Sequence, residues 1–195
     1  MPEDAPPVVV IAGSNGVGKS TAAPWVLSDL LGIHQFVNAD VIAQGLSAFE
    51  PEKAAMQAGR VMLTRLKELA MARESFAFET TMASRSFAPW IDGLCQSGYK
   101  FHLVFLYVPS PELSVLRVAG RVRAGGHHVP DDVIRRRYIG GLRNFFALYQ
   151  PLATGWHFYN SSNPGRPTMV AAGVGTTEVA VFDAPLWKSI KESFK

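Results

Sequence analysis

Residues 8–20 read VVVIAGSNGVGKS, and this stretch decides the fold of the chain. Its first five residues are apolar and mostly β-branched, which is typical of a buried parallel strand. Residues 13–20 then match the pattern G-x-x-x-x-G-K-[ST], whose glycines let the backbone turn around an anion with its N–H groups pointing inward. The helix predicted over residues 18–31 adds the positive end of its dipole. A strand, a loop and a helix in this order predict a binding site for a nucleoside triphosphate.

The remaining sequence alternates between strand and helix patterns. We expect further strands at 35–38, 75–79, 100–108 and 156–159. We expect helices at 51–73, 87–96, 111–124 and 130–149, then a hairpin over 168–183 that turns at 173–175, and a last helix at 184–194. This order predicts an α/β fold, a three-layer, kinase-like P-loop NTPase with a central, mostly parallel five-stranded sheet plus a C-terminal β-hairpin. We expect one domain over residues 1–195, with 113–150 as a basic, helical, lid-like subregion.

Composition narrows the class of protein. The chain has 195 residues, 48% of them hydrophobic, which is enough for one sizeable core. A net charge of +3 is too weak by itself to indicate nucleic-acid binding. The single cysteine, Cys95, excludes an internal disulfide framework and a Cys-rich zinc site, and it indicates a reducing compartment. Because no apolar run suits a signal peptide or a membrane span, we expect a cytoplasmic protein without a membrane partner.

The phosphate loop predicts ATP and Mg²⁺ as ligands. Lys19 is expected to reach the β- and γ-phosphates, and the Ser20 hydroxyl is expected to ligate Mg²⁺. An Asn-Lys-x-Asp run, which commonly reads guanine, is missing from the sequence, and this favours ATP over GTP. The residues expected to bind the nucleotide are Gly13, Ser14, Asn15, Gly16, Val17, Gly18, Lys19, Ser20 and Thr21.

Two carboxylates, Asp40 and Glu79, follow the ends of predicted strands. Ligands of open α/β sheets bind beyond the carboxyl ends of the strands, so both side chains are expected on the γ-phosphate side. One carboxylate can accept the proton of an attacking hydroxyl, and the other can hold Mg²⁺ directly or through water. The alternatives are that Asp40 caps a helix beginning at Val41 and that Glu79 pairs with Arg85 at the strand end.

A basic segment follows residue 111. Seven of the 19 lysines and arginines lie within it, namely Arg117, Arg121, Arg123, Arg135, Arg136, Arg137 and Arg143. Phosphoryl transfer needs cations near the phosphoryl group that is transferred. The planar guanidinium group of arginine supplies a positive charge with several hydrogen-bond donors. A solvated helix face is the alternative for many of these side chains. Asp131 and Asp132 interrupt the segment, which argues against a strip that binds RNA or DNA.

The segment GGHHVP at 125–130 joins the two basic helices. Its glycines and proline predict a hinged lid over the nucleotide. Either of its histidines, His127 or His128, could donate a hydrogen bond to phosphate or substrate. Adjacent histidines without a third ligand do not indicate a metal site.

The ordered set of motifs over residues 8–165 resembles the zeta-toxin family of P-loop kinases, nearest to its small bacterial branch of predicted ATPases. The segments that carry the resemblance are 13–21, Asn38-Ala39-Asp40, Phe78-Glu79-Thr80-Thr81, 121–130, Arg136-Arg137-Tyr138, 141–146 and 156–161. The resemblance implies a kinase that uses ATP and Mg²⁺ to phosphorylate a small-molecule hydroxyl acceptor, a nucleotide sugar such as UDP-N-acetylglucosamine. It also implies an antitoxin protein as partner.

The resemblance assigns roles to individual residues. Lys19 and Ser20 hold the phosphates and magnesium, and Asp40, the general base, is also expected at the metal. Glu79 orients substrate or base, and Arg121, or else Arg117 beside the nucleotide, is the lid arginine on the transferring phosphoryl group. Where the toxins carry a second arginine before a Thr-Pro, this chain has His127 before Val129-Pro130, so that role falls to Arg136 or Arg137. The expected substrate-side residues are Glu79, Thr80, His127, Arg136 and Arg137.

Two other functions fit the same motifs. One is a nucleotide-binding regulatory ATPase module that lacks a small-molecule acceptor and hydrolyses ATP slowly. The other is a polynucleotide kinase or RNA-binding ATPase, which would show a salt-dependent affinity for oligonucleotides. A hydroxyl acceptor that raises ATP consumption far above the water background would separate the kinase from the regulatory module.

Overall fold

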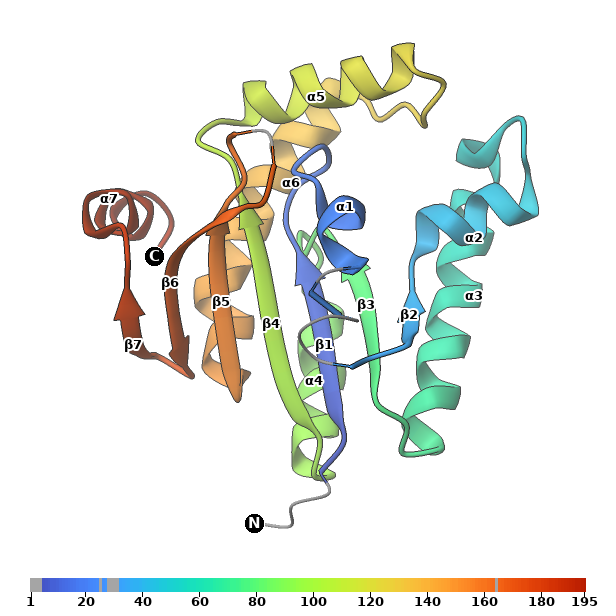
Figure 1. Ribbon diagram of the computed structural model, residues 1–195. Helices are drawn as coiled ribbons and strands as arrows, with labels where there is room; N and C mark the ends of the chain where they lie inside the picture. Colours follow the sequence, from blue (N-terminus) through green and yellow to red (C-terminus); the bar gives the residue numbers. More distant parts are fainter. Residues whose placement is uncertain (1–4, 25, 28–31, 164) are drawn as a thin grey trace.

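One seven-stranded sheet forms the centre of the computed structural model, which describes residues 5–24, 26–27, 32–163 and 165–195 (Figure 1). The strands follow the order β2-β3-β1-β4-β5-β6-β7 across the sheet. Their bounds are β1 Pro7–Ala12, β2 Gln35–Val37, β3 Phe76–Thr80, β4 Lys100–Tyr107, β5 Gly155–Asn160, β6 Thr168–Val174 and β7 Thr177–Val181.

The first five strands pair in parallel, and β6 and β7 pair antiparallel. The predicted five-stranded parallel sheet and its C-terminal hairpin are therefore confirmed, and the hairpin extends the same sheet beside β5. Gly173 explains how closely it docks, because a Cβ there would lie 2.4 Å from the Trp156 ring. The indole Nε1 of Trp156 also donates a hydrogen bond to the Gly175 carbonyl at 2.8 Å.

Helices cover both faces of the sheet, with α1 in front of it and α4 and α6 behind it in Figure 1. Their bounds are α1 Lys19–Pro24, α2 Ala39–Leu46, α3 Pro51–Met71, α4 Phe87–Gln96, α5 Pro111–Arg123, α6 Asp131–Asn144 and α7 Ala184–Phe194. Two predicted helices, 87–96 and 184–194, have the expected bounds. Within the predicted helix 18–31, residues 25 and 28–31 lie outside the described residues. No helix in the described ranges is long and apolar enough to cross a membrane.

The helix expected over 130–149 changes character after Asn144. It continues as the π-helix η2, Phe145–Tyr149, and then as the 3-10 turn η3, Gln150–Leu152. The N–H of Gln150 donates to the Phe145 carbonyl, five residues back, which is the bond that defines a π-helix. Pro151 has no N–H to continue the π-helical hydrogen bonds, and η3 closes instead through the Ala153 N–H, which donates to the Gln150 carbonyl at 3.1 Å.

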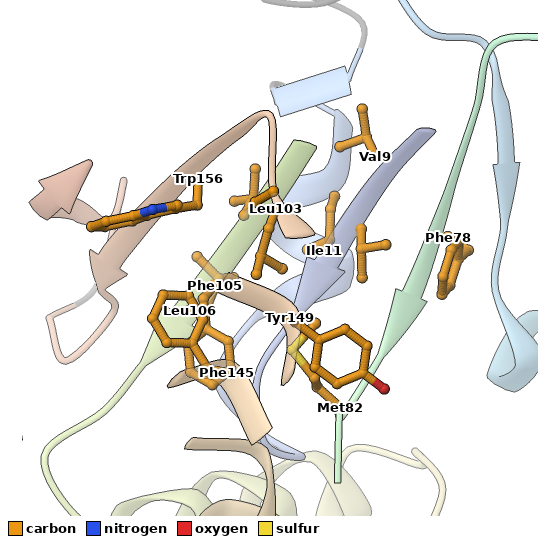
Figure 2. Close-up of a cluster of buried hydrophobic side chains, with 14 of the residues drawn as sticks. Val9, Ile11, Phe78, Met82, Leu103, Phe105, Leu106, Phe145, Tyr149 and Trp156 are labelled. Atoms are coloured by element: carbon orange, nitrogen blue, oxygen red, sulfur yellow. The ribbon is translucent and has the colours of Figure 1, made fainter. Parts of the chain in front are cut away.

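The core fixes β1 at the centre of the sheet. Residues 8–12 are almost wholly buried, as expected of a parallel strand with both faces covered. On the η2 side, the ring of Phe145 packs edge-on against Phe105, Phe158 and Trp156, and Figure 2 shows part of this buried cluster. The rigid strand therefore presents the phosphate loop at a fixed place.

The carboxyl ends of the parallel strands share one edge of the sheet, at the top of Figure 1, where α5 also lies. The phosphate loop follows β1, and Asn38 follows β2 at this edge. Glu79 lies opposite Ile11 in the pairing of β3 with β1. The expectation that Asp40 and Glu79 share an edge with the phosphate loop is therefore confirmed.

Candidate active site

The phosphate loop needs its glycines for both shape and space. Gly13, Gly16 and Gly18 have φ values of 138°, 79° and 95°, in the region that favours glycine. A Cβ on Gly13 would lie 2.3 Å from the Leu106 carbonyl oxygen, and one on Gly16 would lie 2.6 Å from the Ser114 carbonyl oxygen. The loop therefore sits tightly between β4 and α5 without any side chain in the way.

Lys19 lies buried within the loop, with 6% of its surface exposed. Its Nζ donates to the Ser14 carbonyl at 3.0 Å and lies 3.7 Å from Glu79 Oε1. Burial lowers the pKa of Lys19, while the nearby carboxylates Glu79 and Asp40 act in the opposite direction. The ammonium group is thus held between a backbone oxygen and a carboxylate, at the place where a polyphosphate would meet it.

Glu79 is the centre of the polar contacts around the loop. Its Oε2 accepts hydrogen bonds from the Ser20 hydroxyl and from Asn38 Nδ2, both at 2.8 Å. The alternative that Glu79 pairs with Arg85 is wrong, because β3 directs the carboxylate toward Lys19 and Ser20 instead. Glu79 therefore touches the serine that P-loop proteins use to ligate magnesium.

Asn38 connects this cluster to Asp40. Asn38 is the N-cap of α2, and its Oδ1 accepts hydrogen bonds from the backbone N–H groups of Asp40 and Val41 at 2.8 and 3.4 Å. The alternative that Asp40 is itself the cap is wrong, since the helix begins two residues earlier than expected. Asp40 lies instead in the first turn, where the helix dipole favours negative charge.

A cavity of about 760 Å³ opens beside these groups. This volume lies within the range of about 300–1,000 Å³ that is common for ligand pockets. Its charged lining consists of Lys19, Arg60, Arg117, Arg121, Arg137, Asp40 and Glu79. The other predicted site residues on its wall are Asn15, Gly16, Gly18, Ser20, Thr21 and Thr80. Cations exceed carboxylates on this wall, so the cavity suits anionic ligands.

Helix α5 holds the phosphate loop from outside. The Ser14 and Ser114 hydroxyls lie 2.8 Å apart, and Ser114 is fully buried. Arg117, which was expected beside the nucleotide, lines the cavity but donates to the backbone carbonyls of Ser161 and Ser162, both at 2.7 Å. The Ser161 hydroxyl in turn donates to the Val17 carbonyl at 2.7 Å. Gly13, Ser14 and Val17 thus belong to the scaffold that shapes the loop, and they do not line the cavity.

The arginines divide into two groups. Arg117, Arg121 and Arg137 line the cavity. Arg121 donates to the His127 carbonyl at 2.9 Å, and Arg137 donates to Asn15 Oδ1 at 3.2 Å. Burial lowers the pKa of Arg137, and the charge of Asp40 acts against that shift. The second group is exposed, as Arg121 also is, but does not line the cavity, and it fits the solvated-face alternative: Arg123, Arg135, Arg136 and Arg143. Arg136 is therefore outside the cavity wall.

The loop over 125–130 approaches the start of α3. Gly125 has a φ of 86° after the end of α5. His127 Nδ1 lies 3.7 Å from Glu52 Oε2 near the start of α3, so the His127 ring contacts α3 rather than lining the cavity. Within the described ranges, no group of three or more His, Cys, Asp or Glu side chains could hold a metal ion.

Sequence reasoning missed several residues of the site. Asn38 precedes a helix at a strand end, which is an N-cap signature, but Asp40 carries the same signature two residues later. The cavity wall from α3 includes Met56, Gly59, Arg60 and Leu63. These residues follow a helical pattern without chemical signature, and only the tertiary structure brings them to the site.

Known proteins share this fold. The chain is 25% identical over 130 residues to an uncharacterized protein of Haemophilus influenzae, a match that covers 67% of this chain and 91% of the relative. A structure of the AvrRxo1-ORF1:AvrRxo1-ORF2 complex with sulphate ions matches with a TM-score of 0.73 and 18% identity over 95% of this chain. The chain spans 63% of the matched chain's length, and the same complex has also been solved with ATP.

Two further structures have the same architecture. A structure of the PezAT chromosomal toxin-antitoxin system of Streptococcus pneumoniae has a TM-score of 0.67 and 14% identity, covering 97% of this chain and 86% of that one. A gluconokinase from Sinorhizobium meliloti has a TM-score of 0.54 and 17% identity, covering 82% and 85%. These likenesses confirm, at the level of the fold, the kinase-like P-loop architecture that the zeta-toxin resemblance implies.

A family model described as an AAA domain matches residues 8–138, more than half of the chain. The matched region begins in β1 and ends in α6. It includes the phosphate loop, both carboxylates and the cavity-lining arginines through Arg137. The chain therefore belongs to this AAA domain family and has the kinase-like fold of P-loop proteins.

Proposed function

We propose that the chain is an ATP-dependent kinase that transfers the γ-phosphoryl group to a hydroxyl of a small molecule. One observation carries this proposal. Glu79 accepts hydrogen bonds from Ser20 of the phosphate loop and from Asn38, and Asn38 caps the helix that presents Asp40. The loop and both carboxylates therefore form one connected unit, and Lys19, Ser20, Asp40 and Glu79 all line the same cavity.

The two carboxylates take different roles in this proposal. Asp40 lines the cavity in the first turn of α2, where it can accept the proton of the acceptor hydroxyl. The acceptor oxygen then bonds to the γ-phosphorus as the bond to the bridging oxygen of ADP breaks. Lys19 and the inward N–H groups of the loop stabilise the charge that develops on the phosphates, and Arg121 and Arg137 face the same space.

Magnesium fits the oxygen donors near Ser20. The Ser20 hydroxyl and the Glu79 carboxylate are in contact, and Mg²⁺ prefers oxygen ligands and keeps several waters. Because Glu79, not Asp40, contacts Ser20, the proposal assigns the metal side to Ser20 with Glu79 and leaves Asp40 for the proton. When bound, the ion would neutralise charge on the β- and γ-phosphates.

The acceptor is proposed to be anionic, with UDP-N-acetylglucosamine as the first compound to test. The cavity wall carries more cations than carboxylates, which supports a negatively charged partner for ATP. The zeta-toxin resemblance supplies the particular sugar nucleotide. It also supplies a proposed antitoxin partner and a cytoplasmic location, and the PezAT likeness supports the partner.

Mass spectrometry of the acceptor tests the proposal directly. The purified chain is incubated with Mg²⁺, ATP and a panel of nucleotide sugars, nucleosides and matched neutral sugars. We expect one panel member to gain a phosphoryl group and to raise ATP consumption far above the water background. The Asp40→Asn variant should lose this transfer while an Asp132→Asn control, changed at an exposed residue of α6, keeps it. Slow hydrolysis that no acceptor accelerates would refute the kinase and favour a regulatory ATPase.

A further inference from the structure

A side chain outside the cavity holds one of the cavity's walls. We call residues 80–87 the wall segment, because Thr80, Thr81, Ser86 and Phe87 line the cavity. Asn144, the last residue of α6, does not line the cavity. Its Nδ2 donates to the backbone carbonyls of Met82 and Ala83 at 2.9 and 3.1 Å. The middle of the wall segment is thereby tied to the helix behind it.

The wall segment has a backbone shape that needs such support. Met82 has a φ of 58°, in the left-handed region, although it is not glycine. Its side chain is buried, and its N–H donates to Thr80 Oγ1 at 3.1 Å. Residues in this region persist when surrounding contacts impose the conformation, and such strain gathers at functional sites. The Asn144 bonds and the burial of Met82 supply those contacts.

The π-helix η2 supplies a second tie. The Tyr149 hydroxyl donates to the Ser84 carbonyl at 2.8 Å, and the Tyr149 side chain is almost wholly buried. Burial raises the pKa of Tyr149 to about 12, so its hydroxyl keeps the proton that it donates. Figure 2 shows Met82 and Tyr149 in the same buried cluster.

Helix α6 approaches the wall segment closely because of a glycine. A Cβ on Gly141 would lie 2.6 Å from the Thr81 carbonyl oxygen. Seven residues before Asn144, Arg137 of the same helix donates to Asn15 in the phosphate loop. Seven residues of α-helix span about 10 Å. One rigid helix therefore contacts both the phosphate loop and the wall segment.

We propose that Asn144 and Tyr149 are positioning residues, which hold the wall segment in the shape that receives the acceptor. They act through the backbone of Met82, Ala83 and Ser84 and do not touch the reacting groups. The part of this inference that concerns the acceptor rests on the proposed kinase function. The part that concerns the shape of the wall segment does not.

Hydrogen exchange tests the shape without any acceptor. Amide exchange is compared in the full-length chain and in Asn144→Ala, Asn144→Asp and Tyr149→Phe. We expect exchange within residues 81–86 to quicken by about fivefold or more in all three, since each variant removes a hydrogen bond to that backbone. Asn144→Asp keeps the volume of the side chain but places a carboxylate beside two carbonyls, so it should act at least as strongly as Asn144→Ala. The control Arg143→Ala, changed at an exposed neighbour, should leave exchange unchanged.

Kinetics tests the positioning of the acceptor. With an acceptor from the nucleotide-sugar panel, we expect Asn144→Asp and Tyr149→Phe to raise the KM for the acceptor by about tenfold, as misplacement of a substrate predicts. The KM for ATP should stay within about twofold, because the variants leave the phosphate loop intact. If Asn144→Asp does not fold, Tyr149→Phe carries the test, since it removes one hydroxyl from a ring that keeps its packing.

The results separate this inference from the kinase proposal. Faster exchange in 81–86 with no acceptor found would support the shape and refute the kinase. Unchanged exchange in both Asn144→Asp and Tyr149→Phe would overturn the positioning role, whatever the activity. An equal rise in the KM of ATP and acceptor, with exchange faster throughout the chain, would also overturn it, because it would show a general loss of structure.

Discussion

The two ends of the cavity are built differently. At the phosphate loop, Ser14, Asn15 and Lys19 are buried, and α5 and the segment after β5 hold the loop through side-chain hydrogen bonds. At the α3 end, Met56 is 77% exposed although it lines the cavity. Phe49, in the connection between α2 and α3, is 99% exposed. One end is preformed, and the other is open.

From this difference we expect the phosphate-loop end to carry out the chemistry and the α3 end to select the acceptor. A preformed site needs little reorganisation when charge develops in the transition state, so the phosphate-loop end can supply catalysis. An open wall of exposed side chains offers contact area to an acceptor without fixing its identity. Changes at the first end should therefore alter kcat and ATP binding, whereas changes at the α3 end should alter the KM for the acceptor alone.

The strongest test of this division removes the buried ammonium group. Lys19→Ala should lower kcat/KM by at least about 10³-fold, because it deletes the cation that faces the β- and γ-phosphates. Phosphotransfer assays and circular dichroism would measure activity and folding together. Lys67→Ala, at an exposed position of α3, is the matched control and should keep full activity. Full activity in Lys19→Ala would contradict a phosphate site at this loop.

Asp40→Asn tests the proposed base and has the next largest effect. The amide keeps the size of the side chain but cannot accept the proton, so kcat should fall by about 10²-fold or more. The Kd for ATP should change little, because the phosphate loop is intact. Steady-state kinetics would measure kcat, and titration calorimetry would measure the Kd for ATP. An Asp40→Asn enzyme with wild-type kcat would remove the base assignment.

Glu79→Gln sharpens the assignment of the metal side. The amide can still accept a hydrogen bond from Ser20, but it lacks the charge that would balance a cation. We expect the Mg²⁺ concentration for half-maximal activity to rise by about tenfold, with a smaller loss of kcat at saturating Mg²⁺. A Mg²⁺ requirement that shifts in Asp40→Asn and not in Glu79→Gln would reverse the two roles.

The two substitutions with the smallest expected effects compare the two ends of the cavity directly. Ser161→Ala removes the hydrogen bond to the Val17 carbonyl and should weaken ATP binding by a few-fold, corresponding to about 1 kcal/mol. Met56→Ser should leave ATP binding unchanged and raise the KM for the acceptor by about the same factor. Ser193→Ala, at an exposed position of α7, is the control for both. An effect of Met56→Ser on ATP affinity would show that the division between the ends is wrong.

Local patterns predicted the parts of the fold that depend on short stretches of chain. The phosphate loop and the strands around it follow from neighbouring residues, and the structure confirms them. The position of Glu79 at the sheet edge also followed, because carboxyl ends of parallel strands share an edge. The contacts of Glu79 could not be predicted in this way, because its partners Lys19, Ser20 and Asn38 come from other elements.

Three features could not be predicted without the tertiary structure. Asn38 and Asp40 are both good capping residues, and the extended backbone of Asn38, with φ −133°, decides which one caps α2. The π-helical turn at Phe145–Tyr149 accompanies aromatic packing against β4 and β5, which no local pattern records. The part of the cavity wall that α3 supplies could not be predicted either, because Met56 and Leu63 have no chemical signature of binding.

A crystal structure with Mg²⁺ and a non-hydrolysable ATP analogue would test the central claim most directly. We expect the triphosphate within the loop, the metal between Ser20 and Glu79, and the γ-phosphate facing the Asp40 carboxylate across space open to an acceptor. A triphosphate bound elsewhere, or an Asp40 side chain turned away from the γ-phosphate, would contradict the account.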